Sequence, residues 1–383
     1  MNFLSVIVPT KNRSATLKHC LRTILAQETN VPYEIIVSDN RSEDDTQDVV
    51  RSFNDERIKL VQPPSRLGMT EHWEWALRQS SGEWVTIVGD DDALMPSAVE
   101  TIYSVSSEYD VRAISSQRHS FVWPIEGQRS VLKVRGGKGF STHNTKKNLH
   151  LVLMGRLSHK NLPWIYTGGF VKREAIMEVM KIRGTFFKSI SPDLCSAMSL
   201  SLLEDKYLYL HEPVSIGGTS GFSNGRATML CGNKNKILEE FYEESSIKFL
   251  PELGDGHVQS LPLITFEAFK VNAGDFENVV ADTDLTYQLA LTMLKSKKEF
   301  EANVKQYCRD VAGKNNIQWS SVMLMFCVMR YWAPLMTRLA RTSHVSEFSA
   351  KRSGVKVFRG VSDNIYDASR EALSKSRELS QQS

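Results

Sequence analysis

Short apolar runs alternate with amphipathic stretches along the first 115 residues of the chain. Five of these runs are rich in β-branched residues, and they predict strands at residues 4–8, 34–38, 58–61, 84–88 and 111–115. Between the first two runs a helix is indicated by apolar residues at helical spacing, namely Leu17, Cys20, Leu21, Ile24 and Leu25. Strands that alternate with helices form a mostly parallel sheet covered on both faces, so the pattern predicts an α/β fold.

Local signals predict where some of these helices begin. Ser42, with Asp45 three residues later, is typical of a helix N-cap, and Thr70 is expected to cap a helix that carries Trp73. Pro96 suits the first turn of a further helix because its missing N–H has no partner there in any case.

The pattern loosens after residue 115. Residues 116–160 read as an irregular segment, order returns at 164–171, and helices are predicted at 174–182 and 196–203. The glycine-rich stretch 216–225 is typical either of a flexible linker or of a mobile loop over a ligand.

The remainder of the chain divides into two parts by its composition. Residues 226–345 are helical in character, and residues 346–383 form a polar tail that we expect to be partly disordered. Residues 1–225 before them form the α/β unit, with halves at 1–115 and 116–225.

Composition narrows the class of protein. Hydrophobic residues make up 41% and charged residues 24% of the 383 residues, as in a globular protein. The 47 Lys and Arg against 44 Asp and Glu leave a net charge of +3, which does not indicate a nucleic-acid partner. The five cysteines lie far apart without a CxxC pair, so neither a zinc site nor a disulfide framework is indicated and a reducing compartment fits best. With no cleavable signal and no uncharged apolar run of about 18 residues, we expect the protein in the cytoplasm.

Polar side chains follow three of the predicted strands. Pro9 and Thr10 follow the first strand, Asp39 follows the second, and the triplet at 90–92 (Asp-Asp-Asp) follows the strand at 84–88. Ligands of parallel α/β sheets bind outside the carboxyl ends of the strands, so we expect these groups to share one edge. Mg²⁺ and Mn²⁺ prefer such oxygen ligands, whereas an acidic turn in solvent is the alternative for the triplet.

The same segments resemble a known family. The stretches LSVIVPTKNR at 4–13, EIIVSDNRSEDDT at 34–46 and SGEWVTIVGDDDALMPSAV at 81–99 look like a family 2 glycosyltransferase with the GT-A fold, over roughly residues 1–225. The resemblance implies that residues 1–225 are a catalytic domain with a donor half at 1–115 and an acceptor half at 116–225. It also implies inverting transfer of a sugar from a nucleotide sugar, a UDP-sugar by preference, with Mn²⁺ or Mg²⁺.

The resemblance implies roles for the residues at the strand ends. Pro9 and Thr10 would flank the nucleobase, Asp39 would accept a hydrogen bond from its uracil-like edge, and Asp90 would face the ribose. Asp39 as a helix cap and Thr10 as a turn residue remain as alternatives.

Within the triplet the resemblance implies that Asp91 binds the metal that bridges the diphosphate. In the alternative register Asp92 is the ligand instead. Arg66 lies where the family more often has asparagine, and its planar guanidinium suits a donor phosphate, although a plain surface arginine fits equally well.

Inverting transfer needs a general base for the acceptor hydroxyl. The family places an acidic residue at the start of a helix after the acceptor segment, which here is Asp193, where a carboxylate also stabilises a helix N-terminus. Trp164 and Tyr166 are candidates for stacking on an acceptor sugar, with core packing as the alternative.

Many relatives carry a metal-binding histidine in a late loop, and the corresponding stretch 217–225 has none. We therefore expect Ser220 or Ser223 and backbone N–H groups to help hold the diphosphate. His211, the nearest histidine, is either a third metal ligand or a residue at a strand edge.

An apolar stretch with a basic flank follows late in the chain. Residues 317–341 are apolar around most of a helix, and residues 330–360 hold seven Lys and Arg against one Glu. This segment, 317–360, suits either an anionic membrane surface or burial against the catalytic domain or a partner subunit, as in a homo-oligomer.

Taken together, these features predict a metal-dependent inverting glycosyltransferase that builds a surface polysaccharide or glycolipid. Its acceptor would be a saccharide or a lipid-linked sugar, and the protein would be peripheral on the inner face of the membrane. A nucleotidyltransferase and a catalytically degenerate carbohydrate-binding or scaffold protein are the alternative functions.

Overall fold

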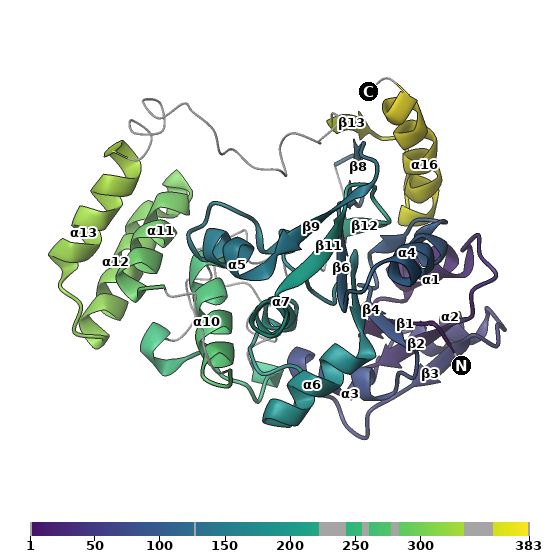
Figure 1. Cartoon of the computed structure of the whole chain (residues 1–383), viewed down its shortest axis with the longest axis horizontal. Coiled ribbons are helices and arrows are strands. Elements are labelled where there is room, and N and C mark those ends of the chain that lie inside the picture. Colours follow the sequence, from purple (N-terminus) through teal and green to yellow (C-terminus); the bar gives the residue numbers. More distant parts are fainter. Residues whose placement is uncertain are drawn as a thin grey trace.

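The computed structural model describes residues 2–125, 128–221, 243–254, 260–276, 283–332 and 355–381. Within these ranges the chain forms two β-sheets, with helices packed on them, and a separate group of helices from the carboxyl-terminal third (Figure 1).

The larger sheet has eight strands in the order β3-β2-β1-β4-β10-β6-β11-β9. Their bounds are β1 Leu4–Thr10, β2 Tyr33–Asp39, β3 Ile58–Val61, β4 Trp84–Ile87, β6 Ala113–Ser116, β9 Phe140–Asn144, β10 Gly169–Lys172 and β11 Lys206–Leu210. Strands β1 to β4 pair in parallel, and β10 inserts antiparallel between β4 and β6. Because β10 is antiparallel to both neighbours, β6 runs in the same direction as β4, and their carboxyl ends share one edge of the sheet.

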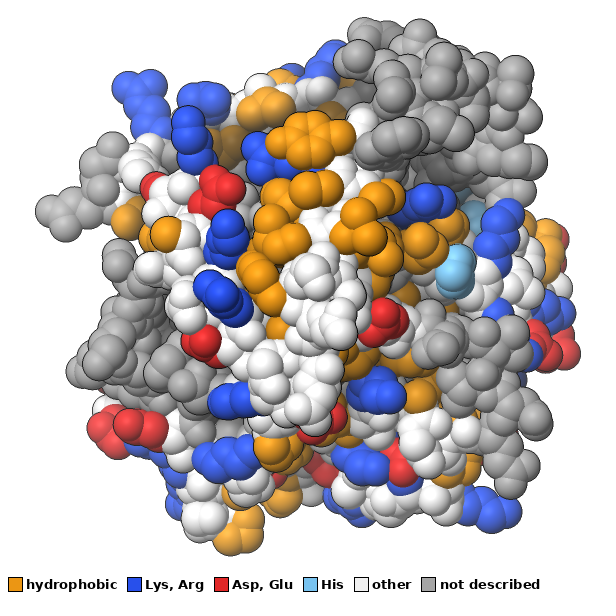
Figure 2. Space-filling model, turned by 90° about the vertical axis from the view of Figure 1, so that its left-hand side faces the viewer, with side chains coloured by type: hydrophobic (Ala, Val, Ile, Leu, Met, Phe, Trp, Pro, Cys, Tyr) orange, Lys and Arg blue, Asp and Glu red, His pale blue; other side chains and the backbone are white. Residues whose placement is uncertain are grey.

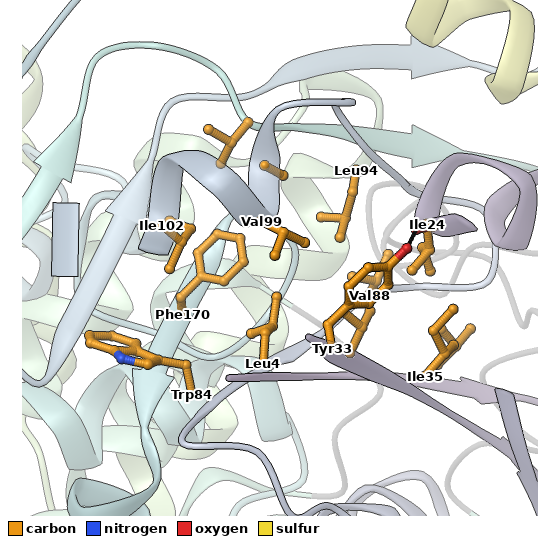
Figure 3. Close-up of a cluster of buried hydrophobic side chains, with 14 of the residues drawn as sticks. Leu4, Ile24, Tyr33, Ile35, Trp84, Val88, Leu94, Val99, Ile102 and Phe170 are labelled. Atoms are coloured by element: carbon orange, nitrogen blue, oxygen red, sulfur yellow. Dashed lines mark hydrogen bonds between the residues drawn. The ribbon is translucent and has the colours of Figure 1, made fainter. Parts of the chain in front are cut away.

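Helices cover both faces of this sheet, as the alternation in the sequence predicts. One face is packed by α1 (Ser14–Leu25), α2 (Thr46–Arg51) and α4 (Ala98–Glu108). Figure 3 shows the core beneath them, in which Leu4, Val99, Ile102 and Phe170 lie close together. The opposite face is packed by α3 (Met69–Arg78), α6 (Arg173–Arg183) and α7 (Pro192–Leu203). The continuous burial of β1 and β2 follows from this double cover.

The five predicted strands are all present, and β3 has the predicted bounds. The helix starts differ more. Helix α2 begins at Thr46 with Asp45 at the N-cap position instead of Ser42, whose N–H is bonded by the Asp39 carboxylate. Helix α3 has Gly68 at its N-cap, and the Thr70 hydroxyl instead donates to the carbonyl of Ser189.

Helix α4 follows Ser97, so Pro96 precedes the first turn instead of forming it. These three differences share one cause, because tertiary hydrogen bonds and loop geometry outweigh local capping preference.

Residues 116–160, expected to be irregular, contain regular structure. The bounds there are β7 His119–Val122, β8 Val131–Arg135, β9 Phe140–Asn144 and α5 Thr145–Leu153. A second sheet has the order β13-β8-β7-β12-β5, with β5 Ala93–Leu94, β12 Ser215–Thr219 and β13 Val355–Arg359. The strands are short and half-exposed, which weakens their apolar signal.

The end of the chain is more ordered than expected for residues 346–383. Strand β13 pairs with β8, and helix α16 (Ile365–Gln381) packs on the second sheet and on α1 (Figure 1). The helix buries Ile365, Ala368, Ala372 and Leu379 at spacings of 3, 4 and 7, one helical face. Two of these residues are alanines, so the segment reads as polar although it carries a buried stripe.

The carboxyl-terminal third is helical as predicted, within the ranges described. Its helices are α10 Leu261–Ala273, α11 Leu285–Lys295, α12 Glu301–Lys314 and α13 Trp319–Cys327, the last continued by a π-helical turn at Val328–Trp332. They enclose a core of their own, and α10 joins that core to α7 and α5. The α/β class with a helical carboxyl-terminal region is therefore confirmed.

Candidate active site

The carboxyl ends of β1, β2 and β4 bring the predicted donor residues together. Thr10 is the register partner of Asp39 across β1 and β2, and its hydroxyl donates to Asp90 Oδ2 at 2.8 Å. Thr10 thus connects the end of β2 with the loop after β4. The side chains of Thr10, Asp39 and Asp90 are buried, with exposed fractions of 3%, 0% and 2%.

Arg13 holds the first carboxylate of the triplet. Its guanidinium lies 3.0 Å from Asp90 Oδ1; the side chain of Asp90 is buried and that of Arg13 is partly exposed. Burial raises the pKa of Asp90, while the charge of Arg13 lowers it again. The sequence signal for Arg13 is its place three residues after Thr10, where a short loop turns back over the strand end.

Asp92 is enclosed by protein donors. Its Oδ1 accepts the N–H of Gly218 at 2.6 Å, and its Oδ2 accepts the hydroxyl of Thr167 at 2.5 Å. Burial, and then the negative charge of Asp91, raise the pKa of Asp92 to about 6. Its neutral form is therefore favoured more than in an ordinary aspartate.

Asp91 lies between these two residues and bonds to β12 and β7. Its Oδ2 accepts the N–H of Ser220 at 3.1 Å, and its carbonyl accepts the Trp123 indole N–H at 3.0 Å. A Cβ atom at Gly218 would lie 1.8 Å from that carbonyl, so only glycine allows β12 to approach this closely.

The triplet suits a divalent cation that also takes oxygen ligands from a substrate. Among the residues described, no three His, Cys, Asp or Glu side chains form a complete metal cage. Within that part of the chain Asp92 also forms no ion pair, although it is buried beside a second carboxylate. One or two carboxylates completed by phosphate oxygens and water is the arrangement Mg²⁺ commonly adopts.

Asp39 lies at the carboxyl end of β2, beside Thr10. Its Oδ1 accepts the N–H of Ser42 at 2.9 Å and its Oδ2 accepts Gln62 Nε2 at 2.7 Å. Beneath it, His72 Nε2 and Ser38 Oγ are joined by a 2.7 Å hydrogen bond, and burial lowers the pKa of His72 to about 4. Asp39 therefore orders the loop after β2 and stays at the edge shared with Thr10, whereas the N-cap of α2 is Asp45, so the helix-cap alternative for Asp39 does not hold.

Two further donor candidates lie at the border of this edge. Pro9 is a half-buried residue of β1 opposite Ser38. Arg66 forms a 3.0 Å ion pair with exposed Glu43 and donates to the carbonyl of Arg41. It lies beside the loop after β2, and its observed partners are those of a surface arginine.

Asp193, the predicted general base, lies in the first turn of α7. The Ser191 hydroxyl donates to Asp193 Oδ1 at 2.6 Å, and Pro192 begins the helix. The neighbouring turn η1 (His159–Asn161) packs on α7, and Arg118 and Lys160 are close enough for their charges to interact with both Asp92 and Asp193. The positive charges of Arg118 and Lys160 therefore interact with both acidic centres, Asp92 and Asp193.

The aromatic pair predicted on the acceptor side is mostly packed. Trp164 is 1% exposed, and the Arg118 guanidinium lies 4.8 Å from its ring centroid. Tyr166 is half-buried against Trp73, 5.2 Å between ring centroids, and its hydroxyl hydrogen-bonds Asp92. The structure thus favours core packing for Trp164, whereas Tyr166 borders the triplet.

Sequence reasoning missed Arg118 and Lys160. Arg118 follows β6 by two residues, at the same sheet edge as the triplet, so the rule that finds Asp39 also identifies it. Lys160 lies in the η1 turn, and the charge of Arg118 together with burial lowers its pKa to about 8. No strand or motif marks its position in the sequence.

The glycine-rich stretch is neither linker nor loop at its start, because residues 215–219 are strand β12. Ser220 bonds Asp91 through its backbone, as described above, while Ser223 lies outside the described residues. His211 is buried and hydrogen-bonded to Ser141 Oγ at 3.0 Å, at the end of β11. Its surroundings are those of the strand-edge alternative.

Part of the chain matches a known protein family. Residues 5–157 match the sequence model of the family described as "Glycosyl transferase family 2". The chain carries a family 2 glycosyltransferase region. That region contains Thr10, Asp39 and the aspartate triplet, whereas Asp193, Trp164 and Tyr166 follow it.

Curated relatives extend the similarity of this family 2 region. The chain is 28% identical over 218 residues to the GalNAc(5)-diNAcBac-PP-undecaprenol beta-1,3-glucosyltransferase of Campylobacter jejuni, covering 56% of this chain and 63% of the relative. It is 30% identical over 97 residues to the UDP-Glc:alpha-D-GlcNAc-diphosphoundecaprenol beta-1,3-glucosyltransferase WfgD of Escherichia coli, covering 25% and 38%. The chain thus spans less than two thirds of the length of these relatives.

Solved structures include Staphylococcus aureus TarS, with a TM-score of 0.49 and 16% identity. That alignment covers 86% of this chain and 55% of TarS.

Proposed function

We propose that this chain is an inverting glycosyltransferase that moves a sugar from a UDP-sugar to a hydroxyl of a saccharide or lipid-linked acceptor. The single observation that carries the proposal is the meeting of Thr10, Asp39 and the Asp90–Asp92 triplet at one sheet edge, with Asp193 in the first turn of α7 and Arg118 interacting with both acidic centres. One acidic centre would bind the donor and its metal, and the other would accept the proton of the attacking hydroxyl.

On the donor side, buried carboxylates that can accept hydrogen bonds lie near the end of β1. Asp39 would accept an N–H of the nucleobase, with Pro9 and Thr10 beside it, and Asp90 would face the ribose. The bonds of Asp39 to Ser42 and Gln62, and of Asp90 to Thr10 and Arg13, fix these side chains before any ligand arrives. Arg66 would reach a donor phosphate only by leaving Glu43, so it is the weakest donor candidate.

Asp91 and Asp92 would hold Mn²⁺ or Mg²⁺, which supplies positive charge for the diphosphate leaving group. The pKa of Asp92 is raised because its negative charge would be buried beside that of Asp91. A bound cation would stabilise that negative charge, so the raised pKa supports a metal-binding role. Backbone N–H groups of β12 and Ser220 contact the same carboxylates and give them a fixed orientation.

On the acceptor side, Asp193 would accept the proton of the attacking hydroxyl. It lies in the first turn of α7, where a carboxylate interacts favourably with the helix N-terminus. Arg118 would offset negative charge between the two acidic centres, and Tyr166 would border the acceptor.

The outer helix α13 supports an acceptor that is presented at a membrane surface. Leu324, Val328 and Tyr331 lie at spacings of 4 and 3 and are 68%, 42% and 62% exposed. Figure 2 shows hydrophobic side chains gathered on this face of the molecule with Lys and Arg around them. None of the helices described is long and apolar enough to cross a bilayer. We propose that this face lies against the membrane that carries the acceptor.

The basic flank predicted together with this helix is divided in the structure. Lys356 and Arg359 belong to β13, beside β8 and α16, at the other end of the molecule from α13 (Figure 1). Residues 333–354, with most of the remaining basic side chains, lie outside the described ranges. The proposed membrane face is therefore limited to α13 and its π-helical turn.

The nucleotidyltransferase alternative needs basic side chains open to phosphates near the amino terminus. Lys11 pairs with Glu244 at 2.5 Å and Arg13 pairs with Asp90, so both are already engaged by carboxylates. A degenerate scaffold would have no need for the buried carboxylates of the triplet, whose burial is costly without a ligand. The glycosyltransferase remains the better supported function.

A thermal-shift screen of nucleotide sugars with and without Mn²⁺ tests this proposal. We expect one UDP-sugar to raise the melting temperature in the presence of Mn²⁺ and to have little effect without it, because only a ligand bound to the native state stabilises it. Stabilisation by a nucleoside triphosphate together with a sugar phosphate, and not by any nucleotide sugar, would favour the nucleotidyltransferase.

A further inference from the structure

A cavity lies where the carboxyl-terminal helices meet α5. It measures about 230 Å³ and opens between the end of α5, the start of α10 and the middle of α11. It is smaller than the pockets that enclose whole drug-sized ligands, so it suits one chemical group of a larger molecule.

The charged side chains that line the cavity are positive. Arg156 and Lys295 line it, and no acidic side chain does. In the part of the chain that the structure describes, neither of these two cations forms an ion pair. His159 also lines the cavity, but burial lowers its pKa to about 4, so it is neutral near pH 7.

Lys295 is held against the end of α5. Its ammonium donates to the carbonyl of Gly155 at 3.3 Å, and a Cβ atom at Gly155 would lie 3.0 Å from that nitrogen. Gly155 has no side chain and a φ of +65°, so the Lys295 ammonium can lie directly against the backbone. One ammonium and one guanidinium are thereby presented to the same small space.

Much of the remaining lining is apolar, with Ser158, Thr265 and Gln288 as its polar side chains. Val152, Leu157, Leu291 and Pro262 form much of the wall, and Leu261 at the start of α10 is 47% exposed. Cations beside an exposed apolar rim match an anionic group that is attached to a hydrocarbon chain.

The cavity is next to the proposed catalytic carboxylate. His159 forms its wall and begins the η1 turn, which packs on α7 where Asp193 lies. The charges of Asp193, Lys160 and Arg118 all interact with the His159 ring. A group in the cavity is thus separated from the acceptor side of the active site by one turn of chain.

We propose that this cavity binds the phosphate of a phosphate-linked, hydrocarbon-bearing acceptor, with Arg156 and Lys295 as its cationic contacts. The inference rests on the proposed function, and it makes the acceptor a lipid phosphate or diphosphate instead of a free saccharide. In this arrangement the phosphate lies between α5 and α11, the hydrocarbon leaves past Leu261, and the attached sugar extends toward Asp193. The same phosphate chemistry occurs in phospholipid headgroups, so the test must separate these two sources.

The test is binding of farnesyl diphosphate to the full chain, measured by titration calorimetry. We expect the double variant Arg156→Gln/Lys295→Gln to bind at least tenfold more weakly than the wild type. The control Lys298→Gln/Lys305→Gln removes the same charge from exposed positions outside the cavity and should bind like the wild type. Equal affinity of the cavity variant and the control would overturn the proposal.

Three further probes identify the ligand chemistry. Farnesol should not bind, and inorganic pyrophosphate should bind more weakly than farnesyl diphosphate because it lacks the chain. Equal binding of pyrophosphate and farnesyl diphosphate would overturn the hydrocarbon part of the proposal. Capture by phosphatidylglycerol vesicles that depends on Arg156 and Lys295, without binding of farnesyl diphosphate, would overturn it in favour of a headgroup site.

Farnesyl diphosphate binding is measured independently of the stabilisation by a UDP-sugar and Mn²⁺. The cavity variant should keep the stabilisation by UDP-sugar and Mn²⁺, because its substitutions lie outside the donor edge. Farnesyl diphosphate binding in a protein that no nucleotide sugar stabilises would reject the proposed function and leave the phosphate site standing.

Discussion

The proposed donor edge and the proposed acceptor side of this molecule are built in different ways. At the donor edge, Asp39, Asp90 and Asp92 come from the ends of neighbouring strands, and each is fixed by hydrogen bonds from the protein itself. On the acceptor side, Asp193, Lys160 and Arg118 come from a helix start, a 3-10 turn and a strand-end loop. The first set is ordered by a sheet, and the second by the packing of helices against it.

This difference indicates how the two sides would meet their ligands. The donor edge concentrates negative charge that a cation and a nucleotide would complete. The acceptor side keeps positive charge near Asp193, and the cavity behind it adds Arg156 and Lys295. A fixed acidic donor edge and a basic acceptor side suit a neutral or anionic acceptor that approaches a metal-bound donor.

Replacing the proposed base should have the largest effect. We expect Asp193→Asn to lower kcat by about 100- to 10,000-fold, the usual contribution of a positioned general base, without weakening UDP-sugar binding. Asp205→Asn, at an exposed acidic residue that follows α7, serves as the control. Measured turnover of Asp193→Asn within threefold of wild type would remove Asp193 from the chemistry.

Breaking the ion pair at the donor edge should cost stability. In Arg13→Met, buried Asp90 loses its cation, and we expect the free energy of unfolding to fall by about 2–4 kcal/mol in urea titration. Addition of Mn²⁺ with a UDP-sugar should restore part of this loss. An unchanged unfolding midpoint would mean that Asp90 does not depend on Arg13.

Buried Glu267 in α10 should make the stability of the protein depend on pH. This buried carboxylate accepts the Ser189 hydroxyl at 2.5 Å, and burial raises its pKa to about 7. The folded state therefore holds a proton that the unfolded state has released, so stability should fall as pH rises between about 5 and 7.

Glu267→Gln should remove about 2 kcal/mol of this pH dependence, an order-of-magnitude value from linkage between the two pKa values. Glu252→Gln, an exposed carboxylate of the same region, should leave the pH dependence as in the wild type. Thermal unfolding at pH 5, 6 and 7 measures both variants, and parallel curves for Glu267→Gln and the wild type would refute the assignment.

The smallest effect should come from Arg66 at the border of the donor edge. Its partner Glu43 is 78% exposed, so Arg66→Gln should change the unfolding free energy by less than about 1 kcal/mol. Loss of more than tenfold in UDP-sugar affinity in the same variant would instead show that Arg66 leaves Glu43 for a donor phosphate.

The sequence predicted the fold best where strands are buried on both sides. The strands at 4–8 and 84–88 are buried apolar runs, and they appear almost as predicted. The second sheet was missed because β8 alternates Leu132 and Val134 with a lysine, and β12 contains two glycines. Helix α16 was missed because alanines supply part of its buried face.

The residues of the candidate site also differ in how well the sequence predicts them. Thr10, Asp39 and Asp90 follow strands, so the position of a residue after a strand was enough to find them. Lys160 and Glu267 depend on contacts between distant segments, such as the Ser189 and Glu267 pair at 78 residues of separation. A single sequence holds no local signal for such contacts.

The central claim is that the aspartates of the donor edge bind a UDP-sugar with a divalent cation, while Asp193 acts only on the acceptor. The most direct measurement is calorimetric titration of UDP-glucose with Mn²⁺ into the wild type, Asp91→Asn, Asp92→Asn and Asp193→Asn. The account predicts binding to the wild type and Asp193→Asn, with loss in at least one of the two triplet variants. Equal affinity in all four proteins, or loss in Asp193→Asn alone, would contradict it.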